Sequence, residues 1–452
     1  MRYDACIIGA GPDGLAAAAR LAGAGLKVLL VERANETGGP CATREFSPGF
    51  LVSPFADVLA AIPAPLFRDL DLAPRGALFT AAVPGPYAEL QAEVIQRVYE
   101  DAARPVAGGL SFQRRMPEPP FPGEPLATMA LADIAPEGVS LEAASLMPFD
   151  PAIPGSALAI LAGAPGGLAR GGLGSLGKAL TRAAEEAGAE ISLGLEVTDI
   201  RRRGGRVSAV SLADGREIGT RAVISTLDLK RTFLSLFAWN ELPKSLVERV
   251  GAFRSAPGVA RFLVALSHIP RRAEGLRAPI LLSADGERAY HAWKSGIVPT
   301  RPPALVRVVS AIDPAMAPSG KAVATVTLGG IPHSPFDGPW THEKRLKLEA
   351  LARDMLEEAL PGSAETIIAS ELLVPPDFEN LLGLTEGDLM GGELAAAQML
   401  GFRPFAECRG MRTPVPGLYL AGPSSALGPI ATCASGWAAA AAVLADLGGA
   451  HG

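Results

Sequence analysis

The chain has 452 residues, of which 48% are hydrophobic and 19% charged, and its formal net charge is −6. A chain of this length exceeds one ordinary core, so we expect two interleaved lobes. The negative charge argues against a nucleic-acid partner, and no run of eighteen uncharged apolar residues predicts a membrane-spanning helix.

The chain enters a strand by Ala5 without a charged segment followed by an apolar one, so we expect no signal peptide. The four cysteines show neither a C-x-x-C pair nor the spacing of a metal knuckle, and the histidines do not cluster. We therefore expect free thiols, no metal site and a cytoplasmic protein. Peripheral contact with a membrane stays open, because the apolar excess fits a buried tunnel or an apolar surface.

The first elements in chain order form a β-α-β unit. Residues 4–8 predict a short buried strand, residues 14–24 a helix that ends at Gly25, and residues 27–32 a second strand. This order within about thirty residues is typical of a doubly wound parallel sheet.

A G-x-G-x-x-G motif lies between the first strand and the helix, at Gly9, Gly11 and Gly14. The three glycines allow a tight turn, a close approach of the backbone to a pyrophosphate, and close packing of helix on strand. Glu32 closes the second strand, where a carboxylate accepts hydrogen bonds from ribose hydroxyls and disfavours a 2′-phosphate. The unit therefore predicts a site for the ADP half of a dinucleotide.

Two further glycine segments need interpretation. Gly38-Gly39 follows the acid and is predicted to let the chain pass under the diphosphate, although a simple turn is the alternative. A second hexapeptide, residues 172–177, also fits G-x-G-x-x-G, but a loop precedes it and no acid closes a following strand, since Glu196 lies early in its strand. We therefore reject it as a nicotinamide site and expect a loop packed near the cofactor.

The rest of the chain alternates further strands and helices. Asp214-Gly215 predicts a hairpin, and residues 103–165 are rich in Pro, Gly and Ala with weak periodicity. Helices are expected over 175–187, 342–360 and 433–447, and strands over 190–200, 205–212, 216–225, 258–267, 304–312, 321–329 and 417–421.

The motifs together resemble the amine oxidase and phytoene desaturase superfamily, in the phytoene-desaturase-like branch with the pyridine nucleotide-disulphide oxidoreductase domain-containing proteins. The extended signature runs from Gly9 to Thr43. It resumes at Gly171-Gly172, Glu196-Val197, Ala222 to Ser225, Lys230 to Leu234, Gly383 to Thr385, Gly392-Glu393, Arg403-Pro404, Arg412 to Pro414 and Gly417 to Gly422.

The resemblance implies FAD as cofactor and an α/β fold, in which a glutathione-reductase-like Rossmann FAD-binding domain is interleaved with a mixed-sheet substrate domain. The FAD-binding domain is expected at 1–60, 166–230 and 400–452, and the substrate domain at 61–165 and 231–399. It also implies that Val197 contacts the adenine side through its backbone. The expected cofactor contacts are Gly9, Gly11, Gly14, Glu32, Arg33, Gly38, Gly39, Thr43, Val197, Gly422, Pro423, Ile430, Ala431 and Thr432.

The chain departs from the family at Pro40, Pro423, Gly391 and the segment 425–429, where relatives often carry other residues, including histidines. FAD binding survives these changes because backbone groups carry most of it, whereas substrate chemistry does not transfer. No catalytic residue is assigned. His291, Trp293 and Glu393 are kept only as candidates for the substrate pocket.

We expect removal of hydride from a hydrophobic organic molecule, of the desaturase or dehydrogenase type. A flavin amine oxidase, whose aromatic cage could use only Tyr419 and Trp437 near the closing motif, is an alternative. A flavin-dependent isomerase and a non-catalytic flavin-bearing protein are two others. The sequence leaves the substrate, electron acceptor and oligomeric state open.

Overall fold

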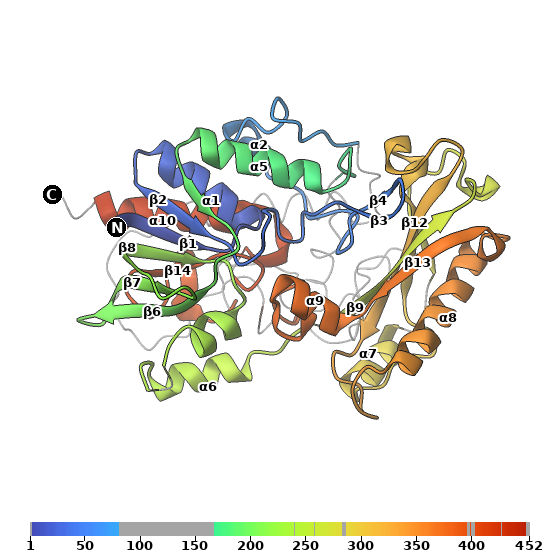
Figure 1. Ribbon diagram of the computed structural model, residues 1–452. Helices are drawn as coiled ribbons and strands as arrows, with labels where there is room; N and C mark the ends of the chain where they lie inside the picture. Colours follow the sequence, from blue (N-terminus) through green and yellow to red (C-terminus); the bar gives the residue numbers. More distant parts are fainter. Residues whose placement is uncertain are drawn as a thin grey trace, which may run out of the picture.

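The computed structural model describes residues 2–80, 167–238, 240–256, 258–282, 286–395, 398, 403–425 and 427–448. Within them, two sheets form the centres of two lobes (Figure 1). The segment 103–165, expected in the second lobe, lies outside the described residues.

The first lobe is built on a largely parallel sheet with the order β5-β2-β1-β8-β7-β6, and β14 pairs with β8. The expected β-α-β unit is confirmed: α1 (Pro12–Gly23) follows β1 and leads into β2, which pairs with β1 in parallel. The strands are β1 (Arg2–Ile8), β2 (Val28–Val31), β5 (Glu190–Ser192), β6 (Val197–Arg203), β7 (Arg206–Leu212), β8 (Glu217–Ser225) and β14 (Leu418–Leu420).

Helices cover both faces of this sheet. On one face α1, α5 (Gly174–Glu186) and α10 (Ala434–Gly448) share a core with α2 (Ala64–Asp69), and many of its residues are alanines. Small side chains let α1 and α10 approach closely, and a Cβ at Gly436 would lie only 1.8 Å from the carbonyl oxygen of Asp13. On the other face a π-helical turn (Arg231–Ser235) and α6 (Lys244–Ala252) pack against the meander β6 to β8.

The second lobe holds an antiparallel sheet with the order β10-β11-β12-β9-β13. Its outer face is covered by α8 (His342–Ala359), and its inner face meets the hairpin β3–β4 (Figure 1). The remaining elements are β3 (Arg44–Ser47), β4 (Phe50–Val52), β9 (Gly258–Leu266), β10 (Ile280–Leu282), β11 (Ala304–Val308), β12 (Ala322–Ile331), β13 (Ile367–Leu373), α7 (Gly286–Lys294) and α9 (Pro375–Leu382). Short 3-10 turns span Arg271–Ala273, Val309–Ala311, Pro314–Met316, Ala364–Thr366, Thr385–Gly387, Ala406–Met411 and Gly428–Ile430.

Two expected strands are shorter or divided in the structure. The run 190–200 is split into β5 and β6, because Gly194 takes a φ of 65° and its N–H bonds to the carbonyl of Ala34. The run 304–312 ends at Val308, where a 3-10 turn begins. The hairpin at Asp214-Gly215 is confirmed, with β7 antiparallel to β8.

In the part of the chain that the structure describes, no helix is long and apolar enough to cross a membrane. Nor do three or more His, Cys, Asp or Glu side chains gather there as a metal site would require.

Candidate dinucleotide site

The predicted cofactor residues converge at one edge of the first sheet. The glycine-rich loop follows β1, Glu32 follows β2, Thr226 follows β8 and Gly422 follows β14. These four strands are parallel, so their carboxyl ends share an edge. In doubly wound folds, this is the edge at which ligands bind.

The glycine-rich loop has the geometry of a phosphate cradle. A Cβ at Gly14 would lie 2.0 Å from the carbonyl oxygen of Gly9, so the third glycine lets helix and turn pack together. A Cβ at Gly11 would meet no heavy atom within 4 Å. Among the described residues, the backbone N–H groups of Gly11, Asp13 and Gly14 find no acceptor. Space, free donors and the positive end of α1 therefore fit a diphosphate.

Glu32 supports this loop as well as facing its edge. Its carboxylate accepts hydrogen bonds from the N–H of Ala10 at 2.7 Å and from that of Ala34 at 2.8 Å. Each carboxylate oxygen can accept a second bond, so ribose hydroxyls can still be held. Val197 lies close to this acid, because the N–H of Leu195 bonds to the carbonyl of Glu32 at 2.9 Å.

The double glycine passes directly beneath the loop. Gly38 and Gly39 have φ values of 109° and 52°, and a Cβ at Gly39 would lie 3.3 Å from Cα of Gly11. A Cβ at Gly177 would likewise lie 3.2 Å from Cα of Gly38. The second hexapeptide thus supplies a packing surface for α5 against the double glycine.

The amino end of α5 is already satisfied by side chains. Thr43 Oγ1 accepts a hydrogen bond from the N–H of Gly174 at 2.9 Å, and Ser53 Oγ accepts one from the N–H of Leu173 at 2.9 Å. An anion at this helix end would have to displace both hydroxyls. The arrangement argues against a second dinucleotide at residues 172–177.

The occupied end of α5 carries a prediction for nicotinamide nucleotides. Anaerobic mixing of the flavin-loaded protein with NADH or NADPH should leave the flavin oxidised on the stopped-flow timescale, because the described helix end that resembles a second site offers no free donors. Absorbance near the main visible flavin band measures this, with dithionite as the positive control. Rapid bleaching by either nucleotide would contradict the prediction.

The C-terminal part of the site is tied to the loop by Asp13. Its carboxylate accepts hydrogen bonds from Ser435 Oγ at 2.6 Å and from the N–H of Gly436 at 2.9 Å, so it caps α10. Removal from water raises the pKa of Asp13, while these hydrogen bonds oppose that rise. A carboxylate at this position weakens the positive end of α10 that the family resemblance leads one to expect near the flavin.

The predicted residues around 422–432 take structural positions in this edge. Gly422 donates its N–H to Ser435 Oγ at 2.8 Å, and the carbonyl of Pro423 accepts from Arg403 Nε at 2.9 Å. Thr432 Oγ1 donates to the carbonyl of Ala60 at 2.6 Å, and Ala431 is buried. The backbone of Ile430 lies in the preceding 3-10 turn.

The side chain of Arg33 does not face the loop. It is exposed, and its Nη2 donates to the carbonyl of Asn380 at 2.9 Å, at the C-terminal end of α9. Arg231 Nη1 donates to the carbonyl of Gly383 at 2.9 Å beside it. These two cations complement the negative end of α9 and join the two lobes.

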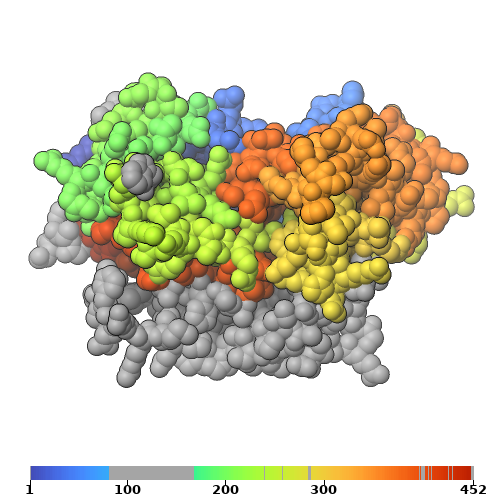
Figure 2. All heavy atoms as spheres, turned by 90° about the horizontal axis from the view of Figure 1, so that it is seen from below, coloured from blue at the N-terminus to red at the C-terminus, as the bar shows by residue number. Residues whose placement is uncertain are grey.

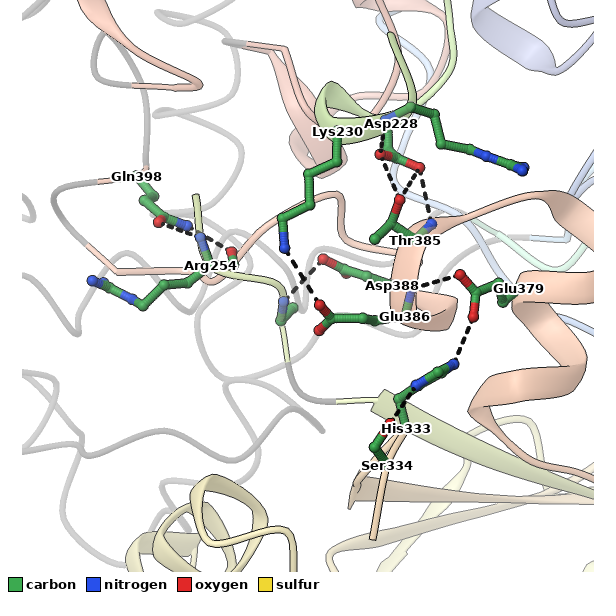
Figure 3. A network of polar contacts seen from close by, with 12 residues as sticks. Asp228, Lys230, Arg254, His333, Ser334, Glu379, Thr385, Glu386, Asp388 and Gln398 are labelled. Atoms are coloured by element: carbon green, nitrogen blue, oxygen red, sulfur yellow. Dashed lines mark hydrogen bonds and ion pairs between the residues drawn. The ribbon is translucent and has the colours of Figure 1, made fainter. Parts of the chain in front are cut away.

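A polar network continues this junction (Figure 3). Asp228 accepts from the N–H and the hydroxyl of Thr385, each at 2.9 Å, and Lys230 Nζ lies 3.3 Å from Glu386 Oε1. In the space-filling view, segments from the middle and C-terminal parts of the chain meet between the lobes (Figure 2). The short connection after α9 thus bridges both lobes.

Asp388 in this network carries a prediction for pH dependence. Its buried carboxylate accepts from the N–H groups of Ala256, Met390 and Gly391, and burial raises its pKa from 3.8 to about 6. Between those values the folded chain holds a proton that the unfolded chain has released, so this group stabilises the fold below pH 4 and loses that contribution as pH rises through 6. The loss amounts to about 3 kcal/mol at most.

The measurement compares the melting temperature of wild type and Asp388→Asn between pH 4.5 and 7. The variant cannot release this proton, so the fall of stability with pH should be smaller than in wild type. Its overall stability should be lower by about 1–3 kcal/mol, because an amide nitrogen replaces one accepting oxygen. Identical pH profiles would contradict the assignment.

The three candidate pocket residues are not equivalent. Glu393 is buried, accepts from Tyr290 Oη at 2.8 Å and pairs with Arg254 Nε. His291 is largely exposed and lies 3.8 Å from Glu287 on the same helix, and the Trp293 ring packs 5.9 Å from that of Tyr290. Only Glu393 therefore belongs to a buried polar cluster.

The aromatic residues of the closing motif are engaged elsewhere. Tyr419 is buried in β14 and donates its hydroxyl to Asp446 at 2.7 Å. The ring of Trp437 lies under the guanidinium of Arg20, 4.5 Å from ring centroid to Cζ, on the α1–α10 contact. These contacts argue against an aromatic cage made from this pair. All four cysteines are free and buried, as expected.

The comparison with family models decides the family. The model of the flavin-containing amine oxidoreductases matches residues 147–444, and that of the NAD(P)-binding Rossmann-like domain matches residues 7–70. The chain belongs to the flavin-containing amine oxidoreductase family. It is therefore a flavin-dependent oxidoreductase, and the resemblance drawn from its motifs is confirmed.

Individual relatives cover nearly the whole chain. The rat pyridine nucleotide-disulfide oxidoreductase domain-containing protein 2 is 25% identical over 98% of this chain and 94% of its own length. A limonene dehydrogenase polypeptide of Castellaniella defragrans is 25% identical over 98% and 95%. Cyclohexylamine oxidase of Brevibacterium oxydans shares the fold with a TM-score of 0.63 at 16% identity, over 99% and 100% of the two chains.

Proposed function

We propose that the chain is an FAD-dependent oxidoreductase that removes hydride from a hydrophobic small molecule, of the desaturase or dehydrogenase type. The observation that carries the cofactor proposal is the cradle at Gly11: open space, three backbone donors without an acceptor among the described residues, and Glu32 at the next strand end. A two-phosphate linkage beside a ribose fits this edge better than a single phosphate. We keep the fourteen residues named from the sequence as the proposed contacts, with Arg33 restricted to its backbone.

The substrate proposal rests on the inner face of the second sheet. That face is lined by a core of aliphatic and aromatic side chains, including Phe55, Val259, Leu263 and Phe378. The full-length relative named as a limonene dehydrogenase supports an apolar substrate. When bound, the flavin accepts the hydride; the chain's own residues orient the substrate and exclude water.

We also propose the division into domains, with two changes from the expected limits. The nucleotide domain keeps 1–60, 166–230 and 400–452, and the substrate domain keeps most of 231–399, while 81–165 lies outside the described residues. Residues 61–80 are moved to the nucleotide domain because Leu66, Leu70 and Leu72 lie in its core. Residues 231–253 are moved as well, because Phe233 and Leu246 pack beneath its meander.

The test has two parts. The nucleotide released by heating the purified protein should co-elute with FAD, and chromatography against FMN and FAD standards decides this. The flavin should then bleach anaerobically with apolar alkenes or terpenes and stay oxidised with primary amines of similar size. Release of FMN, or no flavin after reconstitution with FAD, would overturn the cofactor proposal. Bleaching by amines alone would favour the amine oxidase.

A further inference from the structure

A buried charged cluster lies on the inner face of the second sheet, away from the cofactor edge. Arg261 is 1% exposed and pairs with Asp57, with Nη2 to Oδ1 at 2.7 Å and Nη1 to Oδ2 at 3.1 Å. Thr325 Oγ1 also donates to Asp57 Oδ2 at 2.8 Å. Arg307 completes the row from the next strand, opposite Thr325 in the β11–β12 register.

The cluster holds one more positive than negative charge. Asp57 is engaged bidentately by Arg261, and Arg307 reaches it only through Nε at 3.8 Å. Arg307 is 8% exposed, and its Nε has no hydrogen-bond partner. Among the described residues it has no other ion pair, so a buried guanidinium stands without a full counter-ion. Burial lowers the pKa of Arg307, as expected for a desolvated cation.

The side chain of Arg307 belongs to the face that meets the nucleotide lobe. Val306 and Val308 of β11 pack in the core beneath α8, so the alternating Arg307 points to the opposite face. There, Phe50 and Val52 of the hairpin and Phe55 of the next loop pack against the sheet. The cluster is therefore surrounded by apolar side chains rather than by other acids.

The cluster is also close to the proposed flavin end of the site. Asp57 lies three residues before Ala60, whose carbonyl accepts the hydroxyl of Thr432. Three residues span at most about 11 Å, so a molecule of ordinary substrate length can reach from one point to the other.

We propose that Arg307 binds an anionic group, a carboxylate, on an otherwise apolar substrate. The proposal rests on the proposed function, because it names the substrate class of that same site. A carboxylate would supply the missing counter-charge and could form paired hydrogen bonds with the guanidinium. Apolar neighbours would hold the rest of the molecule.

The test measures equilibrium binding to the flavin-loaded protein, without turnover, by calorimetry and by the shift of the visible flavin band. The probes are decanoate and 1-decanol, which share the chain and differ in charge. Wild type should bind decanoate at least tenfold more tightly than 1-decanol. Arg307→Gln should lose that preference while its affinity for 1-decanol changes less than twofold, and Arg307→Lys should keep part of it.

The matched control is Arg301→Gln, which removes an exposed arginine of the same lobe that pairs with Glu358 at 2.7 Å. It should bind both probes as wild type does. Equal affinity of wild type for the two probes, or full decanoate affinity in Arg307→Gln, would overturn the proposal. The wild-type comparison decides even if the glutamine variant does not fold. Tight decanoate binding without bleaching by any apolar compound would overturn the proposed function and leave this inference standing.

Discussion

Gly14→Ala should abolish flavin retention and lower thermal stability, whereas Gly11→Ala should abolish retention alone. The methyl group at Gly14 would lie 2.0 Å from the backbone oxygen of Gly9, and no flexible side chain can move aside to make room. Overpacking of this kind costs about 1–3 kcal/mol and displaces the loop. Gly11 has a φ of −71° and open space, so alanine fits the protein itself.

The methyl group of Gly11→Ala would instead occupy the space that the diphosphate needs. We expect an FAD affinity at least tenfold lower, equivalent to about 1.4 kcal/mol, with the melting temperature of the apoprotein unchanged. Fluorescence titration of apoprotein with FAD measures the first quantity and calorimetry the second. Gly23→Ala, on the same helix with nothing within 4 Å, is the control and should match wild type. Normal FAD affinity in Gly11→Ala would move the pocket elsewhere.

This difference between two glycines of one motif shows what the sequence predicts and where it stops. The spacing of Gly9, Gly11, Gly14 and Glu32 predicts the β-α-β unit because every partner lies within about thirty residues, where turn and helix geometry are local. The same spacing cannot show that Glu32 also accepts the N–H groups of Ala10 and Ala34.

The roles of distant residues were beyond any local pattern. Asp13 caps α10 through Ser435, 422 residues away, and its position inside the glycine motif gave no signal of that role. Arg33, assigned to the cofactor by its neighbour Glu32, instead bonds a carbonyl 347 residues away. Such pairs depend on how the two lobes fold together, and a single sequence without aligned relatives does not encode them in its periodicity.

The buried acid of the second lobe illustrates the same limit with a larger energy. The segment around Asp57 has the pattern of an ordinary loop, yet its carboxylate meets Arg261 204 residues later. Burial alone would raise the pKa of Asp57, but the charges of Arg261 and Arg307 outweigh it and hold the pKa below its ordinary value. A group with a lowered pKa stabilises the fold above pH 4 and loses that contribution in acid.

Asp57→Ala should therefore produce the largest loss of stability among single substitutions of this lobe. It leaves two buried guanidinium groups without a counter-ion, which costs about 3–5 kcal/mol and should lower the melting temperature by roughly 10 °C at pH 7. Calorimetry of wild type and variant measures the difference. The gap should narrow below pH 4, where the wild-type carboxylate begins to take up its proton.

Two further variants separate the charge from the loss of packing. Asp337→Ala removes an exposed aspartate paired with Lys344 and should change stability by about 1 kcal/mol or less. In Asp57→Ala/Arg261→Met, one uncompensated charge is also removed, so the double variant should be more stable than Asp57→Ala alone. If Asp57→Ala melts with wild type, or if the double variant is the less stable of the two, the buried pair does not hold the loop to the sheet as its geometry indicates.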